Sequence, residues 1–128
     1  MPRKILVVDD DIDIVSAIET ILTLEGYTVI SAYSGNDSFS LINSEKPDLL
    51  LLDYMLPDMT GADVVATLRN NSGTEDLPIV LISAAHGLRA ICEKMPIQGW
   101  IEKPFELERL LTTVRQYTSQ TKNTSDWN

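Results

Sequence analysis

Short apolar runs alternate along the chain with segments whose apolar residues recur every three or four positions. The apolar runs are typical of buried strands, and they lie at residues 4–8, 27–32, 49–53, 79–83 and 97–101. The intervening and following segments predict helices near residues 14–25, 36–46, 61–69, 87–95 and 104–114. The pattern therefore predicts a strand–helix unit repeated five times.

Glycine and proline residues mark the expected ends of these helices. Gly26 lies where a left-handed residue ends a helix, and Pro47 and Pro96 forbid helical continuation. Pro104 lies where a first helical turn tolerates proline, so we expect it to open the last helix. We expect one domain over residues 1–117, and a flexible tail or the start of a linker over the polar, aperiodic residues 118–128.

Strands that alternate with helices are typical of an α/β fold in which a doubly wound parallel sheet carries helices on both faces. We expect five strands in the flavodoxin-like order 2-1-3-4-5, with all carboxyl ends at one edge of the sheet. The polar residues that follow these strands are then expected to converge, and they are Asp9, Asp10, Asp53, Ser83 and Lys103.

A run of four leucines, residues 49–52, ends at the acid Asp53. Continuous apolar runs of this length are typical of strands buried on both faces, and open α/β sheets bind ligands where such strands end. Taken alone, Asp53 is equally compatible with a carboxylate that only ends a strand and faces solvent. Its predicted neighbours favour the functional interpretation.

Asp9 and Asp10 follow the first predicted strand, which is adjacent to the third in this order. Three carboxylates within a few ångströms repel one another unless a proton or a cation offsets their charge. Mg²⁺, or Mn²⁺ in its place, prefers oxygen ligands, so Asp9, Asp10 and Asp53 are candidate metal ligands. We interpret Asp11 and Asp13 instead as favourable charges at a helix N-terminus.

Lys103 adds one positive charge beside the predicted acidic cluster, and the backbone before Pro104 is restricted. An ammonium in this position is suited to hold a phosphate oxygen, and the Ser83 hydroxyl is suited to donate a hydrogen bond to the same group. The alternatives are a solvated lysine and a hydroxyl that caps the following turn. Together the residues suggest phosphoryl transfer onto Asp53, which acts as the nucleophile.

These motifs resemble the receiver domain of two-component response regulators over residues 4–117. The matching residues are Asp9-Asp10, Asp53-x-x-x-Pro57 with Gly61, Ser83-Ala84 and Lys103-Pro104. The resemblance implies that Asp53 is the phosphoacceptor, that Asp9, Asp10 and the Met55 backbone carbonyl bind the metal, that Lys103 binds phosphate, and that Ser83 is the switch hydroxyl.

The resemblance also implies partners and an output. Such domains accept phosphate from a sensor histidine kinase or a phosphotransfer protein and lose it by autodephosphorylation. On phosphorylation they rearrange the region of the fourth and fifth strand–helix units, which then acts on an effector domain or protein. The chain is accordingly expected to be a signalling domain rather than a conventional enzyme.

Two segments depart from the family pattern. Trp100 lies three residues before Lys103, where the family usually has a Tyr or Phe that rotates inward as a switch. A Trp is bulkier, and it is equally compatible with simple packing at the sheet edge. Residues 95–99 differ from the small-residue helix end that commonly precedes the fifth strand, so we expect a short or displaced fourth helix.

Composition excludes several classes of partner. The net charge of −9 over 128 residues disfavours direct contact with nucleic acid or anionic membranes. No apolar stretch approaches the roughly 20 residues of a membrane span, and a single cysteine, Cys92, forms no internal disulfide. We therefore expect a cytoplasmic setting. The one histidine, His86, is expected to be a loop residue.

Two other functions remain open for this pattern. A metal-dependent phosphohydrolase with an aspartyl-phosphate intermediate commonly carries a second acid two residues after the nucleophile, but Met55 occupies that position here. A phosphate-independent interaction module on the same fold is disfavoured by the presence of Asp53, Asp9, Asp10 and Lys103 together, whereas Trp100 keeps it open.

Overall fold

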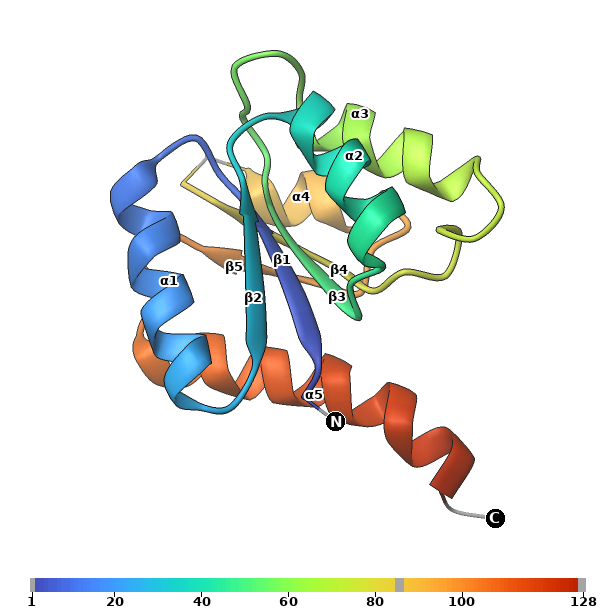
Figure 1. The fold of residues 1–128 in the computed structure, drawn as a ribbon. Helices are drawn as coiled ribbons and strands as arrows, with labels where there is room; N and C mark the ends of the chain where they lie inside the picture. The colour runs from blue at the N-terminus through green and yellow to red at the C-terminus, as the bar shows by residue number, and fades with distance from the viewer. Residues whose placement is uncertain (1, 85–86, 127–128) are drawn as a thin grey trace.

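Strands and helices alternate along the chain in the computed structural model, which describes residues 2–84 and 87–126 (Figure 1). The strands are β1 (Lys4–Val8), β2 (Thr28–Ala32), β3 (Leu49–Asp53), β4 (Ile79–Ser83) and β5 (Gly99–Glu102). The helices are α1 (Ile12–Leu24), α2 (Gly35–Glu45), α3 (Gly61–Arg69), α4 (Leu88–Cys92) and α5 (Leu107–Asp126). The predicted alternation is confirmed.

The five strands form one parallel sheet in the order β2-β1-β3-β4-β5. Helices α1 and α5 cover one face, and α2, α3 and α4 cover the other (Figure 1). This is the predicted doubly wound, flavodoxin-like α/β fold. In the register of β1 against β3, Val8 pairs with Leu52, so Asp9 and Asp53 leave the sheet side by side.

The core lies on both faces of the sheet, because side chains of a strand point alternately to opposite sides. Leu50 and Leu52 of β3 pack in the cluster beneath α2, α3 and α4. Leu49 and Leu51 pack in the cluster beneath α1 and α5. All four leucines are fully buried, which explains why β3 is a continuous apolar run.

Helix α4 spans Leu88–Cys92, which is shorter than the predicted segment of residues 87–95 and in line with the expected short fourth helix. The amides of Lys94 and Met95 donate to carbonyls three residues back, at Ile91 and Cys92. Tight turns therefore replace the helical ladder before Pro96 is reached.

The prediction that Pro104 opens the last helix is wrong. Helix α5 begins at Leu107. The first α-helical hydrogen bond of α5 runs from the Leu110 amide to the Glu106 carbonyl. Pro104 lies in the preceding loop, after a cis peptide bond from Lys103.

Helix α5 also runs to Asp126, beyond the apolar periodicity that ends near residue 114. Residues 118–126 contain neither Gly nor Pro, so nothing interrupts the helical hydrogen-bond ladder. Thr118 is buried, and its hydroxyl lies 3.2 Å from the Tyr27 Oη. The role of residues 118–128 as a tail or linker stays a prediction, and residues 127–128 lie outside the described part of the chain.

Candidate functional site

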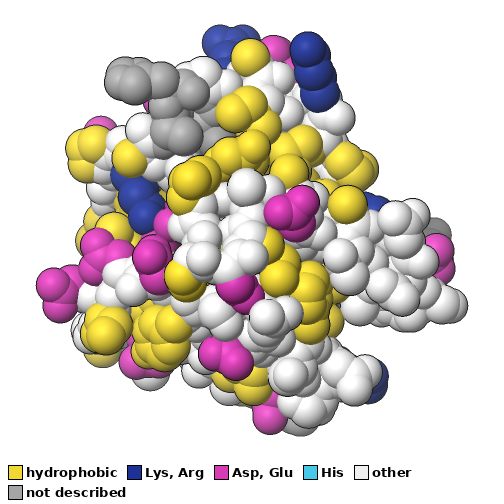
Figure 2. All heavy atoms as spheres, turned by 90° about the horizontal axis from the view of Figure 1, so that it is seen from above, with side chains coloured by type: hydrophobic (Ala, Val, Ile, Leu, Met, Phe, Trp, Pro, Cys, Tyr) yellow, Lys and Arg dark blue, Asp and Glu magenta, His cyan; other side chains and the backbone are white. Residues whose placement is uncertain are grey.

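Three carboxylates converge where β1 and β3 end. Asp9, Asp10 and Asp53 each place an oxygen within 4.8 Å of the others. Asp9 and Asp53 are 3% and 8% exposed, whereas Asp10 is exposed. Figure 2 looks down on the carboxyl ends of the strands, where acidic and hydrophobic side chains are interspersed. The predicted acidic cluster is therefore present in the fold.

Lys103 is the cation of this cluster. Its Nζ lies 2.6 Å from Asp9 Oδ2 and 3.7 Å from Asp53 Oδ2. The Lys103 amide donates to the Ser83 carbonyl at 2.9 Å, so the end of β4 fixes the backbone from which the lysine projects. The structure thus brings Lys103 together with the acids, as the strand ends predict.

The charge of Asp53 is held in an unfavourable environment. Its pKa is raised from 3.8 to about 6, first by burial and then by the negative charge of Asp9. Lys103 and the Met55 amide lower the pKa in part, but they do not offset the first two effects. A cation that joins the cluster would therefore stabilise ionised Asp53.

Ser83 ends β4 beside the cluster. Asp53 pairs with Ile82 in the register of β3 against β4, so Ser83 lies one residue beyond Asp53 along the neighbouring strand. It is 3% exposed. The position fits a hydroxyl that faces a group on Asp53, while its role as a switch stays a prediction.

Met55 contributes backbone rather than side chain to this region. Its amide lies 3.4 Å from Asp53 Oδ1, and the residue is 58% exposed. Residues Met55 and Thr60 form an isolated antiparallel bridge, which folds the β3–α3 loop, residues 54–60, back on itself. The Met55 carbonyl as a metal ligand stays a prediction.

The donor set fits a hard divalent cation. Carboxylate oxygens are the ligands that Mg²⁺ and Mn²⁺ prefer, and exposed Asp10 leaves the cluster open on one side to water ligands. Asp11 lies at the N-terminus of α1, as expected for a favourable charge on that helix. It caps α1, and its carboxylate accepts from the amides of Asp13 and Ile14 at 3.0 Å and 3.3 Å.

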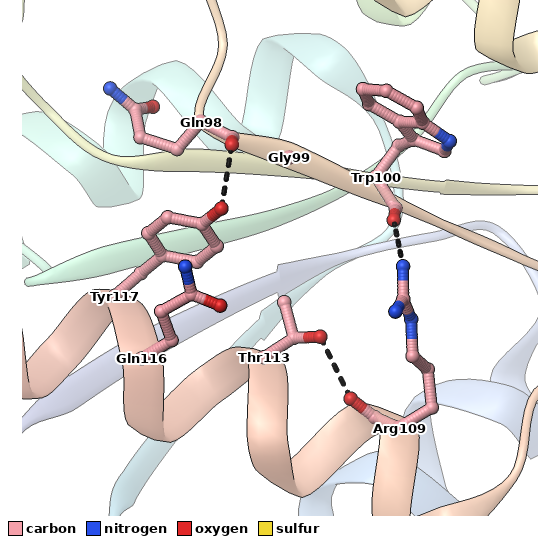
Figure 3. A pocket seen from close by; sticks show the side chains of 7 residues that line it. All are labelled: Gln98, Gly99, Trp100, Arg109, Thr113, Gln116 and Tyr117. Carbon is pink, nitrogen blue, oxygen red and sulfur yellow. Dashed lines mark hydrogen bonds between the residues drawn. The ribbon is translucent and has the colours of Figure 1, made fainter.

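Trp100 is half-buried on β5 and packs against the cluster beneath α2, α3 and α4. Its carbonyl accepts from the Arg109 guanidinium of α5 at 3.3 Å, while the indole points away from that helix (Figure 3). The hollow beside it, between β5 and α5, has a volume of about 190 Å³. Its lining residues are Gln98, Gly99, Trp100, Arg109, Thr113, Gln116 and Tyr117. None of them belongs to the acidic cluster.

The unusual segment before β5 is anchored by contacts that sequence reasoning missed. The Arg69 guanidinium donates to the Pro96 carbonyl at 2.8 Å and to Gln98 Oε1 at 3.3 Å. Gln98 Oε1 also accepts from the Ile79 amide at 2.7 Å. Partners of this segment lie 19 to 29 residues away along the chain, so no local pattern signals them.

Two further sets of contacts near the site were also missed. Thr60 and Asp63 form a capping box at the start of α3, and the Thr-x-x-Asp spacing is a local signal that could have found it. Asp58 accepts from two amides of α2, at Gly35 and Asn36, and no local signal exists for that contact. His86 lies outside the described residues.

The fold and this cluster agree with a family comparison. A model of the response regulator receiver domain matches residues 5–115. The chain belongs to this family. Receiver domains are signalling domains of two-component systems, so the expected family and fold are confirmed.

This receiver domain is similar to part of a longer curated protein. Response regulator MprA of Mycobacterium ulcerans is 35% identical over 128 residues, which cover 98% of this chain and 54% of that protein. The chain thus spans about half the length of this relative.

Among the described residues, no helix is long and apolar enough to cross a membrane.

Solved structures share the fold of this receiver domain. A response regulator from Chloroflexus aurantiacus has a TM-score of 0.87 and 29% identity, covering 93% of this chain and 99% of that one. The chemotaxis response regulator CheY4 of Vibrio cholerae has a TM-score of 0.85 and 28% identity, covering 91% and 99%. NtrX from Brucella abortus has a TM-score of 0.87 and 27% identity, covering 100% of this chain but 30% of that one.

Proposed function

We propose that this receiver domain accepts a phosphoryl group on Asp53 from the phosphohistidine of a sensor histidine kinase or of a phosphotransfer protein. One observation carries the proposal. The Asp53 carboxylate lies at the end of a buried strand, within 4.8 Å of two further acids and 3.7 Å from the Lys103 ammonium. An acid that only ends a strand does not require neighbouring acids and an ammonium. A nucleophile that receives a charged group does require charged neighbours that stabilise that group.

In the proposed reaction, a carboxylate oxygen of Asp53 attacks phosphorus and forms the acyl phosphate. The bond from phosphorus to the donor breaks, and the donor leaves with its electron pair. Lys103, which pairs with Asp9 in the structure, is close enough to Asp53 to hold an oxygen of the transferred group. Ser83 donates a hydrogen bond to another oxygen.

Asp9, Asp10 and Asp53, together with the Met55 backbone carbonyl, would hold Mg²⁺ or Mn²⁺ in this reaction. When bound, the ion offsets carboxylate repulsion and the negative charge on the transferring oxygens. We further propose that the same cluster supports autodephosphorylation, in which a water molecule attacks phosphorus and the acyl phosphate is hydrolysed to inorganic phosphate and free Asp53 without a separate phosphatase.

The proposed output is a change of surface over α4, β5 and α5. Ser83 lies at the end of β4 and Trp100 on the adjacent β5, so movement of the hydroxyl toward a phosphoryl group on Asp53 would alter the packing of the indole. The downstream partner is an effector domain or protein. With a net charge of −9, we propose no direct contact with nucleic acid or membrane, and a cytoplasmic location.

The proposal is tested by intact mass spectrometry after incubation with Mg²⁺ and acetyl phosphate. The wild-type chain is expected to gain one phosphoryl group, and Asp53→Asn is expected to gain none. Asp13→Asn is the matched control, because Asp13 is an exposed acid outside the cluster. An unmodified wild-type mass, or equal modification of Asp53→Asn, would contradict the proposal.

A further inference from the structure

The β3–α3 loop is tied to helix α2 through Asp58. One carboxylate oxygen accepts from the Gly35 amide at 2.8 Å, and the other accepts from the Asn36 amide at 2.9 Å. These amides belong to the first turn of α2, more than 20 residues earlier in the chain. The contact therefore fixes the loop that follows β3 against α2, the helix that precedes β3.

Helix α2 already has a cap of its own. The Ser34 hydroxyl accepts from the Asp37 amide at 3.2 Å, whereas Gly35 and Asn36 donate to Asp58. The same two amides lower the pKa of the Asp58 carboxyl, which stays ionised at neutral pH. The two caps divide the free amides of the helix between a residue that precedes it and a residue of the loop.

Met59 strengthens the attachment next to Asp58. A Cβ placed on Gly35 would come within 2.9 Å of three side-chain atoms of Met59, so the Met59 side chain lies directly against this glycine and would have to shift for a larger residue. Met59 also packs against the core cluster beneath α2, α3 and α4. The outer end of the loop is thus held by two hydrogen bonds to the Asp58 carboxylate and by the apolar contact of Met59.

The inner end of the same loop meets the phosphoacceptor. The Met55 amide lies 3.4 Å from Asp53 Oδ1, and the Leu56 amide donates to the Met59 carbonyl at 3.1 Å. With the bridge between Met55 and Thr60, these bonds make the loop one small folded unit. The folded loop therefore connects Asp58 to Met55.

We infer that Asp58 is a positioning residue, which holds the β3–α3 loop through α2 so that the Met55 peptide stays against the Asp53 carboxylate. The inference rests on the proposed function, in which this peptide and carboxylate bind the metal. Asp58 itself is exposed and touches neither the acidic cluster nor Lys103 in any described contact.

The test compares Asp58→Ala, Asp58→Asn and Ser34→Ala by calorimetric titration with Mg²⁺ alone and by amide NMR spectra. Asp58→Ala is expected to weaken Mg²⁺ binding about three- to tenfold, less than the roughly 10–100-fold typical of groups that bond a metal ligand directly. It is also expected to shift the Met55 amide resonance. Asp58→Asn retains an acceptor oxygen and is expected to recover part of the affinity.

Ser34→Ala removes the other cap of α2 without touching the loop. It is expected to leave both the Mg²⁺ affinity and the Met55 resonance at wild-type values, as long as α2 remains folded by circular dichroism. Wild-type affinity in Asp58→Ala, or an equal loss in Ser34→Ala, would overturn the inference. Failure of the wild-type chain to take a phosphoryl group would instead count against the proposed function, since Mg²⁺ affinity is measured without a phosphodonor.

Discussion

At the residue scale, Asp53 carries an unfavourable charge in the folded chain. Burial and the neighbouring Asp9 raise its pKa from 3.8 to about 6, although Lys103 lies 3.7 Å away. The folded state therefore binds a proton more tightly than the unfolded state, and stability falls as the pH rises from 3.8 to about 6. Such a destabilising charge is typical of a functional site, and here it is expected of carboxylates that bind a cation.

Asp53→Asn removes that charge and is expected to stabilise the metal-free protein by on the order of 2 kcal/mol near pH 7. The gain is expected to shrink toward about pH 4, because the wild-type carboxyl is then protonated as well. Urea unfolding with a chelator present measures the free energy of unfolding of both proteins. A variant that is less stable than the wild type at neutral pH, or a gain that does not depend on pH, would contradict the assigned environment of Asp53.

Sequence reasoning found most of the site at this scale because each residue is the last of a strand or comes soon after its end. Asp9, Asp53 and Lys103 needed only the strand boundaries and the sheet order to be placed together. Asp58 and Arg69 could not be found in this way. The amides that Asp58 accepts from and the Pro96 carbonyl that Arg69 reaches lie more than 20 residues away, and which of these groups is reached depends on how loops fold.

At the element scale, the junction of β3 with α3 is packed so closely at Gly61 that a side chain there would have to displace its neighbours. A Cβ on Gly61 would lie 3.0 Å from the Tyr54 Cα and 3.1 Å from the Asp53 carbonyl oxygen. These atoms belong to the backbone that presents the Asp53 carboxylate. The first turn of α3 therefore limits how that carboxylate is placed.

Gly61→Ala is expected to displace this backbone, at a cost of roughly 1–3 kcal/mol in the free energy of unfolding, and to slow phosphorylation by acetyl phosphate. Thr60→Ala is the control, because it removes the capping box at about 1 kcal/mol without adding an atom beside Asp53. Urea unfolding and the rate of mass gain are measured for both variants. Equal slowing in Thr60→Ala would show that loss of stability alone explains the effect.

Apolar periodicity predicts the bounds of some helices and strands better than those of others. The bounds of β1, β3 and α3 agree with those expected, because each is a buried run or a strongly amphipathic segment between clear breakers. Helix α5 continues past its apolar stripe, and α4 ends before its breaker. In both, backbone hydrogen bonding rather than side-chain pattern decides the end.

At the scale of the whole molecule, the order of strands turns separate motifs into one site. With β1 between β2 and β3, acids that are 44 residues apart in sequence are brought within 4.8 Å, and β5 brings Lys103 to them by way of β4. The two apolar clusters fix this order from both faces of the sheet. The fold therefore supplies the geometry, and a few strand-end residues supply the chemistry.

The central claim is that the phosphoryl group enters at Asp53 and at no other acid of the cluster. After incubation with Mg²⁺ and acetyl phosphate, reduction with borohydride converts a phosphorylated aspartate to homoserine, which peptide mass spectrometry locates. We expect homoserine at position 53 in the wild-type chain and at no position in Asp53→Asn. Homoserine at Asp9 or Asp10, or none in the wild-type chain, would contradict the account.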